Sequence, residues 1–258
     1  MMKTKLIYAA FLAAAMLHAE DASLIFRVNF DGENINPVVA KGTKVAANGS
    51  KIGFANRKVT GFDGKGGALK LDKKTAAKWY VNKNINQKCG TVSLWISPVN
   101  WQVSDKSEHL FFQANMRDFD LRLMRDKNSD ERIIFRITAS GFPGKVKTFF
   151  ATASIAEWKP GTWHKVDLVW NESFMRIFID GELQSYSPQR AGKGAVYSTT
   201  KFPAGTTFPD KTLYGGITLN VSRKINPAEE TAFDELQIRN KISTPDEINA
   251  AYKQERGE

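Results

Sequence analysis

The chain has 258 residues, a single cysteine and a formal net charge of +10 at pH 7. One cysteine excludes an intramolecular disulfide, so stability has to come from a hydrophobic core, with or without a bound metal ion. The basic excess favours acidic partners such as uronic-acid or sulfated glycans, unless it serves only solubility. The sequence has no nucleic-acid reading module, so nucleic acid is not an expected ligand.

The first 19 residues have the pattern of a secretory signal peptide. Lys3 and Lys5 precede an apolar run over 6–17, and Ala19 supplies the small residue before a cleavage site. The run is too short to span a bilayer well, so we prefer a cleaved signal (1–19) to an N-terminal membrane anchor. Residues 20–258 then form one domain, which we expect to be secreted or to reside in the periplasm or at the cell surface, without a later membrane span.

Short segments in which apolar and polar residues alternate recur along the chain, separated by Gly, Asn, Asp and Pro. The first, 24–30, ends at Asp31-Gly32. Further strands are predicted over 69–71, 79–81, 92–96, 119–123, 133–137, 166–170, 175–179, 213–219 and 232–239. Asp180-Gly181 predicts a hairpin, because a two-residue turn needs positive φ.

One helix is predicted, near the C-terminus. Thr244 is a suitable N-cap, Pro245 suits the first helical position, and Glu247 completes a capping box. Many short strands with one terminal helix predict an all-β fold, a two-sheet antiparallel β-sandwich or jelly roll. We expect its first and last strands to be adjacent. Between the sheets we expect Phe26, Leu94, Trp95, Leu168, Ile177 and Ile179.

Three groups of motifs occur in one order. They are F-R-V-N-F-D-G-E-N at 26–34; G-A-L-K-L at 67–71 with G-T-V-S-L-W-I-S-P at 90–98; and W-H-K-V at 163–166 with I-F-I-D-G at 177–181 and F-D-E-L-Q-I-R-N-K-I-S-T-P-D-E-I at 233–248. The combination resembles the bacterial secreted laminin-G-like jelly-roll domains of the concanavalin A-like lectin/glucanase superfamily. The resemblance covers most of 23–253 and implies mainly structural roles for these motifs. The long loop 187–210 departs from it.

The sequence does not carry the catalytic pattern of the glucanases on this fold. Their paired carboxylates begin Glu-x-Asp on one strand, and no Glu here is followed two positions later by Asp. His109 with Arg122 or Tyr197 is the alternative for a lyase, but no motif supports it. We therefore expect no enzymatic activity.

A calcium site is predicted at the seam between the first and last strands. Asp31 ends the first strand and Asp234 lies in the last, and backbone carbonyls and water would complete the six to eight oxygens that calcium prefers. The resemblance implies such a metal, since related glucanases and lectins carry one at this seam. The alternative is that each aspartate only hydrogen bonds to a turn.

A cluster of lysines around two aromatic residues predicts a ligand-binding surface. Residues 65–88 hold seven lysines and one acid, which suits a sugar ring stacked on an aromatic side chain with its acidic group near the ammonium groups. The candidates are Lys73, Lys74, Lys78, Trp79 and Tyr80, with the loop aromatics Trp101 and Tyr197 in addition. If 79–81 is a strand, one of Trp79 and Tyr80 faces inward. The alternative for the lysines is a solvated face without a ligand.

Together these features predict a secreted, non-catalytic carbohydrate-binding domain with a glycan ligand, more readily an acidic one. A structural or adhesive domain that holds a protein partner is the alternative from another class. A glycoside hydrolase or polysaccharide lyase with an unrecognised site is the third. Aromatic residues in a groove would favour glycan binding, whereas a flat apolar patch would favour a protein partner.

Overall fold

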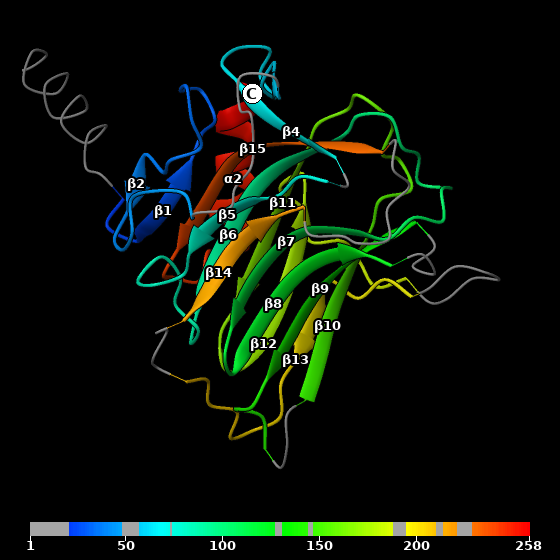
Figure 1. The fold of residues 1–258 in the computed structure, drawn as a ribbon. Helices are drawn as coiled ribbons and strands as arrows, with labels where there is room; N and C mark the ends of the chain where they lie inside the picture. Colours follow the sequence, from blue (N-terminus) through cyan, green and yellow to red (C-terminus); the bar gives the residue numbers. More distant parts are fainter. Residues whose placement is uncertain are drawn as a thin grey trace, which may run out of the picture.

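The computed structural model describes residues 21–47, 57–72, 74–126, 131–143, 147–187, 195–209, 214–220 and 229–258. These residues form two antiparallel β-sheets that pack face to face, with a helix at the C-terminal end (Figure 1). The predicted all-β sandwich is therefore confirmed. No helix among the described residues is long and apolar enough to cross a membrane.

The larger sheet has nine strands, and the strands at the two ends of the domain are neighbours in it. Its order is β13 (Thr199–Lys201), β12 (Phe174–Ile179), β11 (His164–Trp170), β6 (Gly90–Pro98), β15 (Glu230–Arg239), β1 (Leu24–Val28) and β2 (Val39–Ala40), while β4 (Ala68–Asp72) pairs with β15 and β3 (Lys58–Val59) pairs with β4. β1 runs antiparallel to β15, with Phe26 opposite Ile238. The predicted adjacency of the first and last strands is confirmed.

The smaller sheet has six strands and lies at the front of Figure 1. Its order is β10 (Lys147–Ser154), β9 (Arg132–Ala139), β8 (Phe119–Arg125), β7 (His109–Met116), β14 (Gly215–Leu219) and β5 (Ala77–Tyr80). All pairs within this sheet are antiparallel. One face of the sheet packs on the core, and the other faces outward.

The core fills the space between the sheets, and five of the six predicted core residues lie in it: Phe26, Leu94, Leu168, Ile177 and Ile179. Trp95 is also buried, but it is on the opposite face of β6. There it stacks on Phe62 with 4.2 Å between ring centroids and lies 5.8 Å from the ring of Tyr252. The prediction for Trp95 was wrong about the side of the sheet, because a second layer covers that side.

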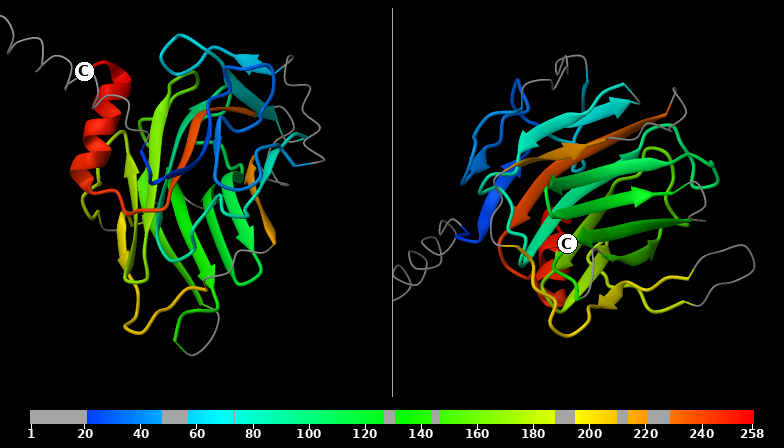
Figure 2. Two further views of the ribbon diagram at one scale, coloured as in Figure 1. Left: turned by 90° about the vertical axis from the view of Figure 1, so that its left-hand side faces the viewer. Right: turned by 60° about the horizontal axis from the view of Figure 1, so that its bottom comes forward.

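This second layer is the helix α2 (Pro245–Arg256), which lies along the outer face of the nine-stranded sheet (Figure 2). Its predicted capping box is confirmed, with Thr244 accepting from the backbone N–H of Glu247. Ile248 packs against Val169 and Phe178, which point away from the main core. β11 is therefore buried on both faces, and even Lys165 is only 3% exposed, with its Nζ 2.6 Å from Glu255 Oε1.

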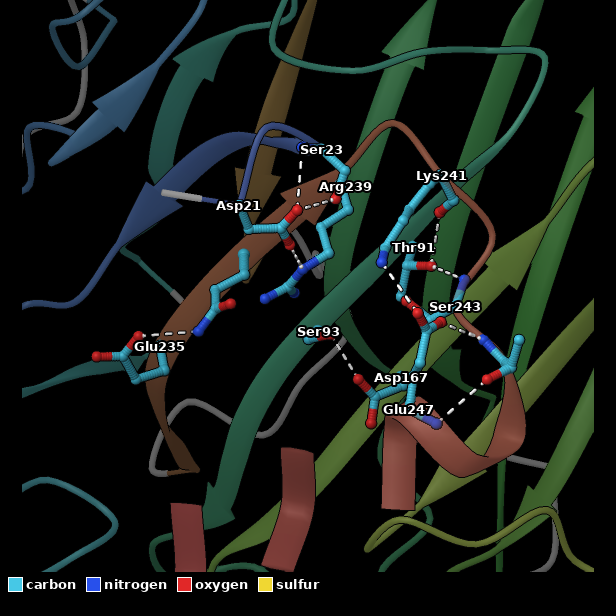
Figure 3. Close-up of polar contacts among 12 residues, drawn as sticks. Asp21, Ser23, Thr91, Ser93, Asp167, Glu235, Arg239, Lys241, Ser243 and Glu247 are labelled. Atoms are coloured by element: carbon cyan, nitrogen blue, oxygen red, sulfur yellow. Dashed lines mark hydrogen bonds and ion pairs between the residues drawn. The ribbon is translucent and has the colours of Figure 1, made fainter. Parts of the chain in front are cut away.

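Polar contacts anchor the ends of the domain to this sheet (Figure 3). Asp21 lies at the start of the described chain and forms an ion pair with Arg239 at the end of β15, at 2.9 Å. The hydroxyl of Thr91 donates to the carbonyl of Lys241 and accepts from the N–H of Ser243, just before α2. The contacts of Thr91 hold the segment that leads into α2 against the nine-stranded sheet.

Candidate ligand-binding face

The outer face of the six-stranded sheet carries two rows of mostly polar side chains that cross all six strands. Cross-strand partners share a face of a sheet, so the pairing register defines each row. The first row is Lys78, Thr218, Gln113, Arg122, Arg136 and Phe150; the second is Tyr80, Gly216, Asn115, Asp120, Thr138 and Thr148. We call these twelve positions the outer face.

Asp120 is the centre of a hydrogen-bond network on the outer face. One of its oxygens accepts from Gln113 Nε2 at 2.6 Å and from Asn115 Nδ2 at 3.0 Å. Its other oxygen lies 2.6 Å from Arg122 Nε and 3.3 Å from Arg136 Nη2. Partial burial by itself raises the pKa of Asp120, but the two amide donors and the charge of Arg122 outweigh it and hold this pKa below its ordinary value.

Arg122 and Arg136 are directly opposite each other on β8 and β9. Like charges in this position destabilise a sheet, and one ionised aspartate neutralises only one of them. Both guanidinium side chains also stay partly accessible, at 30% and 27% exposed. The pair is therefore a fixed, partly uncompensated cationic site, and guanidinium groups suit carboxylate and sulfate oxygens.

A hollow of about 290 Å³ adjoins this cationic site. Its walls include Asp120, Arg122, Arg136 and the turn at Arg117 and Asp118 between β7 and β8. This volume is at the lower end of the range for small-molecule sites. It suits one charged group or one sugar unit better than a large enclosed ligand.

Two of the residues predicted to bind a ligand lie on the outer face. Lys78 and Tyr80 point outward from β5, and the tyrosine is 40% exposed. Lys74 is exposed in the turn between β4 and β5, beyond the end of the sheet face, and its N–H donates to Asp72. Lys73 is outside the described residues. Of the predicted lysines that the structure describes, Lys78 alone shares the outer face with the arginine pair.

The structure corrects two aromatic predictions. Trp79 is fully buried between the sheets, where its Nε1 donates to the carbonyl of Ile35 at 2.7 Å. Trp101 is also fully buried, and its Nε1 donates to the hydroxyl of Thr231 at 3.0 Å. Neither ring is accessible to a ligand, because the hydrophobic effect favours placing these large side chains in the core.

Tyr197 is partly buried and lies away from the outer-face rows. Its N–H donates to the hydroxyl of Thr152, and its carbonyl accepts from the N–H of the same residue. The tyrosine backbone thus covers the edge of the sheet at β10. Sequence reasoning placed it in an open loop and had no signal for this contact.

The predicted metal ligands Asp31 and Asp234 both contact the turn from Gly61 to Gly67. Asp234 accepts from the N–H of Phe62 at 3.2 Å, and Asp31 accepts from the N–H of Gly67 at 2.8 Å. Burial is the main cause that raises the pKa of Asp234 to about 8, and the charges of Glu235 and Asp31 raise it further. Because both carboxylates bind the same turn, they lie at the same end of the sandwich.

The other carboxylates in β15, and the one directly before it, pair with basic side chains of the same domain. Glu230 forms an ion pair with Lys70 at 3.0 Å, and Glu235 forms one with Arg27 at 2.9 Å. Glu229 is buried and lies 3.1 Å from His109 Nε2.

His164 on β11 lies 2.7 Å from Asp180, which directly follows β12, and its ring stacks on Trp158 at 4.7 Å. Positive φ at Asp180 and Gly181, together with the bridge between Ile179 and Glu182, confirms the predicted two-residue turn. His164, Asp180 and Trp158 line a cleft of about 430 Å³ beside Tyr252 of α2.

The class of protein follows from the fold and from a family comparison. A laminin-G family model, described as the concanavalin A-like lectin/glucanases superfamily, matches residues 63–249. The chain belongs to this family, as its motifs indicated. No curated protein sequence matches the chain significantly.

Solved structures with the same fold include binding domains of bacterial toxins. The receptor binding domain of botulinum neurotoxin D matches with TM-score 0.62 and 14% identity, over 90% of this chain and 53% of that one. The binding domain of Paraclostridial Mosquitocidal Protein 1 matches with TM-score 0.64 and 14% identity, over 90% and 52%. The botulinum neurotoxin serotype G binding domain matches with TM-score 0.62 and 12% identity, over 90% and 51%. The chain spans about half the length of these structures, and at such identities the likeness concerns the fold.

Proposed function

We propose that this protein is an exported carbohydrate-binding domain without catalytic activity, and that an anionic glycan binds to its outer face. The observation that carries the proposal is the arginine pair held by Asp120 on the same face as Lys78 and Tyr80. The signal-peptide pattern at 1–19 supports export. The binding domains among similar solved structures support a binding role.

Each group on the outer face has a role that matches the chemistry of an acidic sugar. The guanidinium groups of Arg122 and Arg136 bind a carboxylate or sulfate, and Lys78 adds a second cationic position three strands from β8. Tyr80 offers an aromatic ring to the apolar face of a pyranose. Because Asp120 occupies the donors of Gln113 and Asn115, it fixes the orientation of both amides before a ligand arrives.

The test compares polymers of different charge. A polyuronate such as alginate, a sulfated polysaccharide such as heparin and a neutral glucan are titrated with the mature protein at about 0.1 M and 1 M salt. Acidic polymers should bind more tightly, and this preference should weaken at high salt, because the Debye length falls from about 10 Å to about 3 Å. Equal binding to neutral glucan would contradict an anionic ligand.

Two double variants that remove the same number of charges test whether the binding site includes the arginine pair. Arg122→Gln with Arg136→Gln should lower the affinity for the acidic polymers by about tenfold or more. The control is Arg27→Gln with Arg57→Gln, which removes two charges from ion pairs on the other sheet and should leave binding nearly unchanged. Surface ion pairs contribute about 0–1 kcal/mol each, so both variants should stay folded. If a folded wild-type protein binds no polymer, a protein partner is the better interpretation.

We further propose that calcium binds at Asp31 and Asp234. Asp31, which follows the first strand, and Asp234, in the last strand, contact one turn here, and the charge of a calcium ion would offset that of a buried carboxylate. Among the described residues no three His, Cys, Asp or Glu side chains are grouped for a metal, so the remaining ligands would be backbone carbonyls and water. Lys58 Nζ already donates to the Asp31 carbonyl and would have to move if that oxygen took part.

A further inference from the structure

Gly216 interrupts the second row of the outer face. It is on β14, with Tyr80 opposite it on β5 and Asn115 opposite it on β7. A side chain at this position would point outward between these two residues, because paired residues share a face. The glycine therefore leaves a gap in the row, and the two strand spacings across it separate Tyr80 from Asn115 by about 9–10 Å.

Gly216 has room for a side chain. A Cβ atom built there has the carbonyl oxygen of Trp79 at 3.6 Å and the hydroxyl of Thr218 at 3.8 Å as its nearest neighbours, which is ordinary van der Waals contact. No atom of Tyr80 or Asn115 lies within 4 Å of this Cβ position. The floor is therefore backbone, and the walls are side chains.

The backbone does not require a glycine at this position, in contrast to the preceding residue. Gly215 has φ of 147° and a Cβ there would lie 2.0 Å from the carbonyl oxygen of Asn115, so a side chain is excluded. Gly216 is not in the positive-φ region and meets no such contact. Since glycine within a strand weakens a sheet and often marks a close approach by a ligand, the gap itself needs an explanation.

The walls of the gap offer the groups that a sugar ring needs. Tyr80 presents a partly exposed aromatic ring, and Thr218 presents a hydroxyl. The amide nitrogen of Asn115 donates to Asp120 on β8, and the amide oxygen of the same side chain is a hydrogen-bond acceptor. An aromatic face together with hydrogen-bonding oxygens matches a pyranose, which has an apolar C–H face and a rim of hydroxyl groups.

We propose that the gap over Gly216 is a subsite for one pyranose ring, which stacks on Tyr80 and hydrogen bonds to Asn115 and Thr218. The inference rests on the proposed glycan-binding function and specifies its ligand. Two strand spacings and a shift of two residues along the strand, together about 12 Å, separate Gly216 from Arg122 on β8. The acidic group at the arginines therefore belongs to another sugar unit, and the ligand is an oligosaccharide that crosses the strands.

Gly216→Val tests this subsite, because it fills the gap and should not harm the fold. Valine favours strands, so the melting temperature should stay the same or rise. Affinity for the acidic polymer that binds best should fall by about tenfold or more, at both low and high salt, because the lost contact is not electrostatic. Thr199→Val is the control, since it introduces the same side chain into strand β13 of the other sheet, outside the outer face.

The outcomes separate the subsite from the proposed function. Loss of binding in a stable Gly216→Val protein, with normal binding in Thr199→Val, supports the subsite. If Gly216→Val binds normally while the variant lacking Arg122 and Arg136 binds poorly, the subsite proposal is wrong. The proposed glycan-binding function is then still supported. Absence of polymer binding by the wild-type protein overturns both.

Discussion

Trp79 and Tyr80 are neighbours on β5 that face opposite sides of the sheet, so substitutions at the two positions should give opposite phenotypes. Trp79 is fully buried, whereas Tyr80 is 40% exposed. Replacing the tryptophan should lower the free energy of unfolding without changing the binding surface. Replacing the tyrosine should do the reverse.

The size of the effect at Trp79 follows from its contacts. Trp79→Phe removes the donor to the carbonyl of Ile35, and an unsatisfied buried acceptor costs about 1–3 kcal/mol. It also leaves a cavity next to Phe26, whose ring lies 5.8 Å away, at about 24 cal/mol per Å³ of residual volume. Together these effects should lower the free energy of unfolding by about 2–4 kcal/mol.

Urea denaturation of the wild type, Trp79→Phe and Tyr80→Leu measures this difference. Tyr80→Leu should change stability by no more than about 0.5 kcal/mol, as for other surface positions, while weakening glycan binding. Folded Trp79→Phe should bind glycan as the wild type does. Unchanged stability of Trp79→Phe, combined with reduced binding, would show that the indole contacts the ligand and would refute the assigned orientation of β5.

Two further predictions concern titration and metal. Burial lowers the pKa of His109 below its ordinary value of 6.5, even though Glu229 opposes the shift. A lowered folded-state pKa means that stability is present above pH 6.5 and is lost as the pH falls below it, at up to about 1.4 kcal/mol per pH unit for one proton. The wild type should therefore lose stability more steeply than His109→Gln between pH 7 and 5, and identical slopes would contradict a buried neutral histidine. For calcium, the melting temperature should rise in calcium relative to chelator, since a hundredfold excess over the dissociation constant adds about 2.7 kcal/mol. Asp31→Asn should abolish that rise, and an unchanged wild-type midpoint would argue against the metal site.

Local sequence patterns were sufficient for most strands and for the helix. Alternation identified segments such as 119–123 and 133–137, because the side-chain period of a strand does not depend on its neighbours. The capping box at Thr244 and the Asp180-Gly181 turn are equally local. β7 escaped prediction because a register shift between Leu110 and Phe112 accompanies the burial of two consecutive phenylalanines, Phe111 and Phe112, which breaks the alternation.

The candidate site was harder to predict, because it depends on which strands are neighbours. Alternation placed Asp120, Arg122 and Arg136 on polar faces, but nothing in the sequence showed that one carboxylate would hold both arginines. The lysine cluster was evident from the composition of 65–88. Of its predicted lysines within the described part of the chain, Lys78 alone lies on the sheet face with Tyr80.

The sequence by itself determined the two-sheet fold, its family and the capped terminal helix, because periodicity, turn residues and caps act over a few neighbouring positions. The tertiary structure alone decided which of Trp79 and Tyr80 faces the solvent and that α2 buries Trp95. It also decided that Gly216 lies between Tyr80 and Asn115, although some 100 residues separate Asn115 from it in the chain. These features depend on strand order and on what covers each face, and both are set by contacts between distant segments.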